Sequence, residues 1–220
     1  MLVEVWSDVV CPWCYIGKRR FERALALLAD DPEFEERIDV VYQPFQLDPT
    51  APPGGTTPVA EAYARKFGGP QRAAQIIDHL TTTAAVDGLE FRLDLAQRAN
   101  TRDAHRLLWY ANTHGPSGSQ EQLKERLLQL YFMEGANIGD PDVLARAAAA
   151  VGLDEADAQR ALAGDDGSAE LAELLAFAAE AGITAVPTYV LDGRWSIPGA
   201  QDPDVFVQVI KRLTAADRVG

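Results

Sequence analysis

The chain has 220 residues, 47% of them hydrophobic, and it carries a net charge of −13 at pH 7 with a pI near 4.6. This charge argues against nucleic acid and anionic membrane surfaces as partners, because both reward clustered lysine and arginine. The N-terminal segment lacks the basic and apolar regions of a signal peptide, and no run approaches the ~18 apolar residues of a membrane span. We therefore expect a cytoplasmic protein.

The first part of the chain follows a strand–helix–strand pattern. Residues 2–7 are apolar and alternating, which predicts a strand. Pro12 suits the first position of a helix, and apolar residues at helical spacing continue to Ala29, where Asp30-Asp31-Pro32 ends the pattern. Residues 38–42 predict a second strand. Two strands around one helix predict parallel pairing with a right-handed crossover.

The middle of the chain is helical. Residues 48–58 are rich in proline and glycine and predict a loop. The stretch that follows is rich in alanine, leucine, glutamate and arginine and has little strand character. Glycine and proline breaks divide it into predicted helices at 59–67, 70–86, 101–113, 119–133, 141–151, 155–163 and 168–181.

Strands return near the C-terminus. Residues 188–191 and 194–197 predict two strands joined by a hairpin at Asp192-Gly193, and a helix follows Asp202-Pro203. The order is therefore βαβ, a helical block, then ββα, an α/β arrangement in which the outer pieces form one small mixed sheet. We expect residues 1–50 and 182–220 to make one domain and residues 51–181 to be a large all-helical insertion.

Cys11-Pro12-Trp13-Cys14 holds the only two cysteines of the chain, at the start of the first predicted helix. A helix N-terminus favours a thiolate, and Cys14 lies one turn further along on the same face. A bridge over so short a loop would add little stability, so the pair is expected to exchange disulfides, with Cys11 as nucleophile and Cys14 as resolving thiol. Two alternatives are half of a zinc site, which needs two more ligands, and a pair of inert buried thiols.

Five segments resemble the DsbA-like thioredoxin superfamily and, within it, the FrnE-like cytoplasmic oxidoreductases. They occur in family order at residues 7–17, 44–47, 100–107, 182–188 and 199–201. The resemblance implies a thioredoxin fold that carries a helical insertion, in agreement with the pattern of elements. It also implies that the Val186–Pro187 bond is cis and lies beside the cysteines, and that the backbone of Val186 pairs with an extended substrate.

Several other residues are candidates for the substrate groove. Pro12 belongs to the motif, and Trp13 and Phe45 are expected to form an apolar wall around the cysteines. His105 would face the cleft from the inserted helices, although a lone helical histidine is more often packed or solvated. Asp8 either tunes Cys11 or serves as a loop or capping carboxylate.

We therefore expect a thiol–disulfide oxidoreductase that acts on a thiol or disulfide substrate, either a protein or a small molecule. No tightly bound cofactor is expected, and glutathione or another thiol would be a co-substrate. The resemblance also extends to kappa-class glutathione transferases and hydroxychromene-carboxylate isomerases, which typically carry serine where Cys11 stands. The alternative is thus a glutathione-dependent transferase or isomerase of small aromatic or polyketide-like molecules. A holdase-like binding protein ranks third, and the sequence leaves the oligomeric state and the direction of electron flow open.

Overall fold

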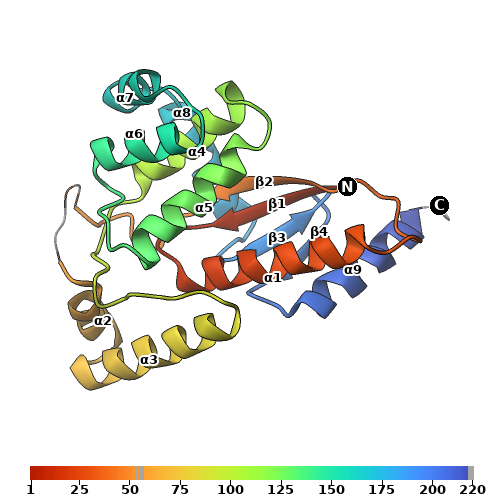
Figure 1. The fold of residues 1–220 in the computed structure, drawn as a ribbon, viewed down its shortest axis with the longest axis horizontal. Coiled ribbons are helices and arrows are strands. Elements are labelled where there is room, and N and C mark those ends of the chain that lie inside the picture. Colours follow the sequence, from red (N-terminus) through yellow and green to blue (C-terminus); the bar gives the residue numbers. More distant parts are fainter. Residues whose placement is uncertain (53, 55–56, 218–220) are drawn as a thin grey trace.

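A computed structural model describes residues 1–52, 54 and 57–217. It contains a four-stranded mixed sheet in the order β2-β1-β3-β4, with helices around it (Figure 1). The strands are β1 (Leu2–Ser7), β2 (Asp39–Pro44), β3 (Thr188–Leu191) and β4 (Trp195–Pro198). The helices are α1 (Pro12–Ala29), α2 (Val59–Phe67), α3 (Pro70–Val86), α4 (Arg102–His114), α5 (Ser119–Phe132), α6 (Pro141–Ala150), α7 (Glu155–Ala163), α8 (Ser168–Glu180) and α9 (Pro203–Asp217).

The sheet pairs as the sequence predicts. β1 runs parallel to β2, in register from Leu2 opposite Asp39 to Ser7 opposite Pro44, so the second strand extends two residues beyond its predicted end. β3 is antiparallel to both β1 and β4. Asp192 and Gly193 form the hairpin turn with φ values of 47° and 63°, the left-handed geometry that two-residue hairpins favour.

Helices α1 and α9 cover one face of the sheet. The rings of Phe21, Tyr189 and Phe206 meet there with centroids 4.7 to 5.1 Å apart, joining α1, β3 and α9. Val3 and Val5 of β1 belong to the same buried cluster. This aromatic and aliphatic layer fixes α1, and therefore the Cys11–Cys14 motif at its start, on the sheet.

Helices α4 to α8 form the larger part of the insertion. On α8, Phe177 stacks on Trp6 of β1 with ring centroids 5.8 Å apart. The side chain of Gln120 satisfies the free edge of β2: its Nε2 donates to the Tyr42 carbonyl over 3.0 Å, and its Oε1 accepts from the Tyr42 N–H over 2.9 Å. This pairing closes an edge that would otherwise expose backbone donors and acceptors.

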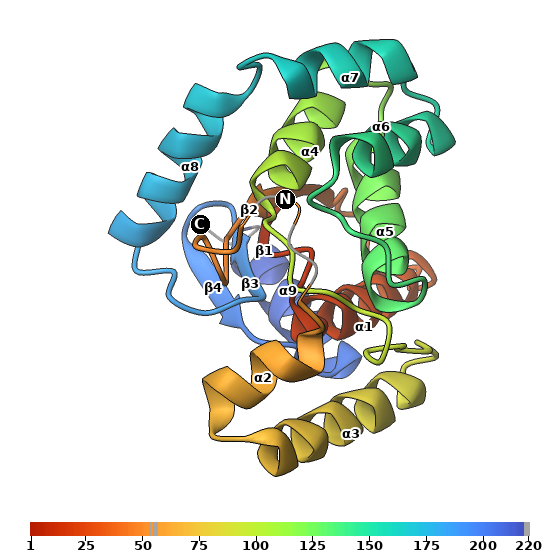
Figure 2. The same ribbon diagram turned by 90° about the vertical axis from the view of Figure 1, so that its left-hand side faces the viewer.

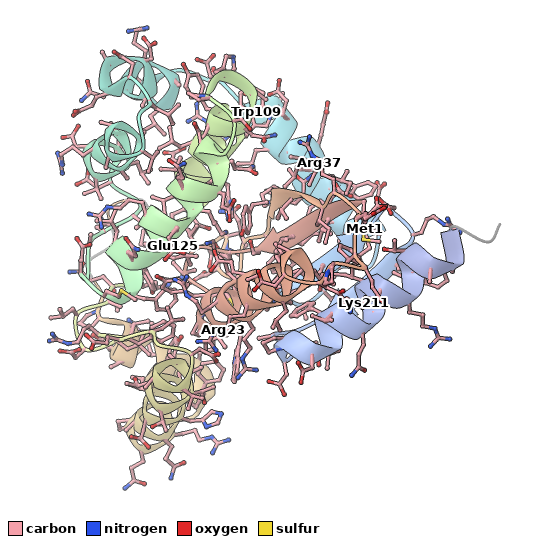
Figure 3. The ribbon with its side chains drawn as sticks, turned by 45° about the vertical axis from the view of Figure 1, so that its right-hand side comes forward. Met1, Arg23, Arg37, Trp109, Glu125 and Lys211 are labelled. Atoms are coloured by element: carbon pink, nitrogen blue, oxygen red, sulfur yellow. The ribbon has the colours of Figure 1, made fainter. Side chains whose placement is uncertain are left out.

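The insertion is joined to α1 by charge as well as by packing. Glu125 of α5, labelled in Figure 3, points toward α1. Its carboxylate accepts hydrogen bonds from Tyr15, Lys18 and Arg19 of α1, each over 2.8 Å. The largest buried cluster also mixes Tyr15 and neighbouring residues with side chains of α4, α5 and α6. The insertion therefore shares a core with the outer pieces of the chain, and the domain limits drawn from the sequence stay a prediction.

The remaining helices, α2 and α3, form a hairpin of their own. Figure 2 shows this hairpin on the opposite side of the molecule from α6 and α7, with the strands and α1 between them. A non-helical segment, residues 87–101, connects the hairpin to α4. Nowhere in the described ranges is there a helix with the length and apolar character needed to cross a bilayer.

Candidate active site

Cys11 is the N-cap residue of α1. Its backbone is extended, with φ −88° and ψ 113°, and its sulfur accepts a hydrogen bond from the backbone N–H of Cys14 over 3.3 Å. Pro12 takes the first helical position, where no backbone donor is needed. The sulfur therefore lies at the end of an 18-residue helix where unpaired N–H groups and the helix dipole favour anions.

The two cysteines are unbridged, and each is 3% exposed. They differ in where they lie relative to the cleft. Cys11 lies on the wall of a deep cleft, whereas Cys14 does not line it. Burial raises the pKa of the Cys14 thiol well above its usual range, with a further contribution from the hydrogen bond to Cys11. A ligand in the cleft therefore meets Cys11 first, and Cys14 lies behind it.

The segment before β3 completes the wall beside Cys11. The Val186–Pro187 peptide bond is cis, and the Val186 carbonyl oxygen lies 3.8 Å from the sulfur of Cys11. Val186 lines the cleft, and its backbone N–H donates to no other described residue. An extended substrate could therefore pair with this backbone, as in strand addition. Pro187 is buried behind it, and its carbonyl accepts from the Gly199 N–H over 2.7 Å.

The cleft has a volume of about 1080 Å³ and opens between the motif and the α2–α3 hairpin. Pro12 and Trp13 form part of its wall. Trp13 is 37% exposed, and its ring centroid lies 6.0 Å from that of His79 on α3, so the indole stands at the entrance and not in the core. The remaining lining residues are Val10, Leu47, Asp48, Val59, Ala62, Tyr63, Arg65, Lys66, Phe67, Arg72, Gln75, Ile76, Leu80, Arg98, Ala99 and Tyr131.

The sequence analysis missed the contribution of the hairpin to this cleft. On α2 the lining residues include 59, 62, 63, 66 and 67, and on α3 they are 72, 75, 76, 79 and 80. Both sets follow the spacing i, i+3, i+4, i+7, i+8, which places them on one face of each helix. The sequence could have predicted this, because two consecutive helices each carry a stripe of apolar and basic residues on one face. Such a pattern indicates that both helices line the same cleft.

Phe45 and His105 are not among the residues that line the cleft. His105 is buried on α4, and its Nε2 lies 2.9 Å from the Phe45 carbonyl and 3.2 Å from Oδ1 of Asp8. Asp8 is fully buried, and its Oδ2 accepts from the Leu47 N–H over 2.8 Å. This network holds the segment after β2 against the turn that leads to Cys11, whose N–H donates to the Asp8 carbonyl over 3.3 Å.

Lys124 is a second residue that the sequence analysis missed. It lies on α5, is 1% exposed, and its Nζ makes no hydrogen bond with the described part of the chain. Burial lowers its pKa from 10.5 to about 8, opposed by negative charge on Cys14, Asp8 and Cys11. The cation thus lies behind the two thiols, within electrostatic reach of both. No group of three or more histidine, cysteine or acidic residues able to hold a metal occurs among residues 1–52, 54 and 57–217.

The comparisons with known proteins identify the family of the chain. Residues 2–211 match the family model described as the DSBA-like thioredoxin domain. The uncharacterized protein YwbO of Bacillus subtilis is 30% identical, over 94% of this chain and 94% of its own length. A solved structure, the probable DsbA oxidoreductase SCO1869 from Streptomyces coelicolor, is 34% identical with a TM-score of 0.86, covering 96% of this chain and 89% of that one.

A more distant structure shares the fold alone. It is the cytosolic disulfide reductase DsbM from Pseudomonas aeruginosa, solved with GSH, at 19% identity and a TM-score of 0.62, covering 98% of this chain and 100% of that chain. The family match spans both the cysteine motif and the Val186–Pro187 segment. We conclude that the chain belongs to the DSBA-like thioredoxin domain family.

Proposed function

We propose that this protein is a thiol–disulfide oxidoreductase whose reacting groups are Cys11 and Cys14. The observation that carries the proposal is the placement of Cys11 at a helix N-cap on the cleft wall, with Cys14 directly behind it. Membership of the DSBA-like family supports this class of reaction, and so does the name of the 34% identical Streptomyces structure. The narrower FrnE-like assignment belongs to the same proposal.

The reaction proceeds in two exchanges. The Cys11 thiolate attacks one sulfur of a substrate disulfide, forms a mixed disulfide and releases the first substrate thiolate. Cys14, after losing its proton, attacks the Cys11 sulfur, releases the second thiolate and closes the Cys11–Cys14 bond. Two electrons pass from the protein dithiol to the substrate, and the reverse sequence oxidises a substrate dithiol. The reduction potential of the couple sets the direction.

The residues around the cysteines hold the substrate. The backbone of Val186 pairs with it, Pro187 fixes the position of that backbone, and Pro12 and Trp13 form the wall beside the attacked sulfur. Phe45 and His105 act at a distance in this proposal, because they position Asp8 and the turn before Cys11. In this proposal the protein works in the cytoplasm, where glutathione or another thiol returns the oxidised pair to the dithiol. Fractionation of cells expressing a tagged chain tests that location.

Single cysteine variants test the proposed function. Cys11→Ser is expected to abolish the reduction of insulin disulfides and of bis(2-hydroxyethyl) disulfide, because no attacking sulfur remains in the cleft. Cys14→Ser should keep the first exchange and accumulate a mixed disulfide on Cys11, visible as an added mass that dithiothreitol removes. Normal turnover in Cys11→Ser would contradict the role of Cys11, and turnover without a trapped adduct in Cys14→Ser would contradict the resolving role.

The size of the cleft favours one alternative, a glutathione-dependent transferase or isomerase of small aromatic or polyketide-like molecules. A volume of about 1080 Å³ with an apolar wall suits a small molecule beside a bound thiol. The two functions differ in their need for Cys14, since only disulfide exchange uses a resolving thiol. Glutathione-dependent turnover of an aromatic substrate that survives Cys14→Ser would favour the alternative.

A further inference from the structure

The cleft beside Cys11 is basic although the whole protein is strongly acidic. The chain has a net charge of −13, yet the described lining residues carry four cationic side chains and a single carboxylate. The cations are Arg65 and Lys66 on α2, Arg72 on α3 and Arg98 before α4, and the carboxylate is Asp48. A concave surface that concentrates one sign of charge raises the local concentration of ligands of the opposite sign.

Two of the four cations are already neutralised by neighbours. Arg98 donates two hydrogen bonds to Asp48, over 2.6 and 3.0 Å, and holds the pKa of that carboxyl below its usual range. Arg65 forms an ion pair with Glu61 over 3.4 Å. These two arginines therefore have carboxylate partners in the protein itself.

Lys66 and Arg72 have no such partner in the part of the chain that the structure describes. Lys66 lies over the ring of Phe67, 5.6 Å from its centroid, and Arg72 donates to the neutral side chain of Gln75 over 3.3 Å. They stand at the facing ends of α2 and α3, on either side of the short turn that joins the helices. The hairpin thus presents two exposed cations that form no ion pair with a described residue. The carboxylate of Asp48 is within electrostatic reach of Lys66, but it is already bound to Arg98.

The surface between this pair and the reactive sulfur is apolar with two hydroxyl groups. Val59, Ile76 and Leu80 line it together with Tyr63 and Tyr131. Neither tyrosine hydroxyl donates a hydrogen bond to another described residue. Burial raises the pKa of Tyr63 to about 12, and charge on Cys11 adds to the effect.

A ligand that reaches both Cys11 and these cations has to span part of α3. His79 lies beside Trp13 at the motif end of the cleft, seven residues along α3 from Arg72, and seven residues of α-helix span about 10 Å. A molecule with a sulfur at Cys11 and an anionic group at Lys66 and Arg72 therefore needs an apolar body between the two.

We propose that the cleft selects small disulfides that carry a carboxylate separated from the reacting sulfur by an apolar or aromatic body. The inference rests on the proposed function, and the electron balance is the same: the dithiol gives two electrons and two substrate thiols leave. Because Cys11 lies on an inner wall and is only 3% exposed, a small molecule reaches it more easily than a loop on a folded protein does.

The test compares two aromatic disulfides, the dianion 5,5′-dithiobis(2-nitrobenzoate) and the smaller, neutral 2,2′-dithiodipyridine. The second-order rate constant of the fully reduced protein is measured with each, from the absorbance of the released thiol. The ratio of the two rate constants is then compared between wild type and Lys66→Gln/Arg72→Gln. We expect the double variant to lower this ratio about tenfold, the equivalent of two modest charge contacts. The ratio cancels any change in rate that the two disulfides share.

A matched control makes the same change of charge elsewhere. Arg146 and Arg212 are exposed on α6 and α9 and do not line the cleft, so Arg146→Gln/Arg212→Gln should leave the ratio at its wild-type value. An unchanged ratio in Lys66→Gln/Arg72→Gln, or an equal fall in the control, overturns the inference. Failure of the proposed function looks different, because the reduced wild type would then react with neither disulfide through Cys11.

Discussion

Gly17 and Pro187 lie so close together that an ideal β-carbon on Gly17 would stand 3.0 Å from Cγ of the proline. The same carbon would stand 2.8 Å from the hydroxyl of Tyr189 and 3.3 Å from the backbone of Ala200. The second turn of α1 and the segment before β3 therefore meet without room for a side chain. This contact fixes the distance between the Cys11 helix and the Val186 carbonyl.

The first prediction concerns this contact. Gly17→Ala is expected to lower the free energy of unfolding by about 1–2 kcal/mol, because the overpacking penalty exceeds the gain in helix propensity. Displacement of Pro187 should also reduce kcat/KM with a disulfide substrate. Urea denaturation and initial rates measure the two effects. Gly164→Ala is the control, since Gly164 is exposed with φ −94° and its β-carbon would make only an ordinary contact of 3.4 Å. Equal stability of both variants would refute the tight contact.

The second prediction concerns the buried ammonium group of Lys124. Its pKa falls from 10.5 in the unfolded chain to about 8 in the folded protein, so the unfolded state binds the proton more tightly. Burial of the charge therefore costs about 3 kcal/mol of stability below pH 8, and this cost fades as the pH rises toward 10.5. Lys124→Met removes the cost of burying this charge. The variant is therefore expected to be more stable than wild type at pH 7, and the difference in the free energy of unfolding should shrink above pH 8.

Denaturant unfolding of both proteins at pH 7, 8, 9 and 10 measures this difference. Comparison of the two proteins at each pH cancels most contributions of other groups, such as the raised pKa of Tyr42, whose ring lies 5.7 Å from the Lys124 ammonium. A stability difference that stays constant over the whole pH range would show that Lys124 does not titrate as described.

The third prediction follows from the effect of Lys124 on the resolving thiol. The lysine charge opposes the burial that raises the pKa of Cys14, so its loss raises that pKa further. In Lys124→Met the second exchange should slow at neutral pH, and the mixed disulfide on Cys11 should live longer, with recovery at higher pH. Acid quenching followed by mass spectrometry measures the lifetime. A lifetime equal to that of the wild type would exclude Lys124 from the resolving step.

The sequence predicted the elements well because local chemistry decides them. Pro12, Pro70 and Pro141 each begin a helix, and the turn at Asp192-Gly193 sits where two short strands must reverse. Cys11 and Cys14 were identifiable because their spacing and their place at a helix start are both local. Contacts between residues far apart in the sequence could not be predicted from such local patterns.

The residues that sequence reasoning missed depend on how distant helices rotate against one another. Lys124 reads as an ordinary solvated position on α5, yet packing of α5 against β2 buries it behind the thiols. Lys66 and Arg72 are exposed charges, and only the packing of α2 against α3 places them on the wall of the cleft that also holds Cys11. His105 was expected at the cleft, but the rotation of α4 turns its ring toward Asp8.

The last prediction separates His105 from the chemistry at Cys11. His105→Ala removes a partner from the buried carboxylate of Asp8, which keeps only the Leu47 N–H, and this should cost about 1–3 kcal/mol of stability. Because the ring does not line the cleft, the rate constant of the reduced, folded variant with 2,2′-dithiodipyridine should stay within about twofold of wild type. His114→Ala, at an exposed position on the same helix, controls for the loss of an imidazole. Full stability with a large loss of rate in His105→Ala would contradict a mainly structural role for His105 and show that it acts on the reaction, directly or by positioning the turn before Cys11.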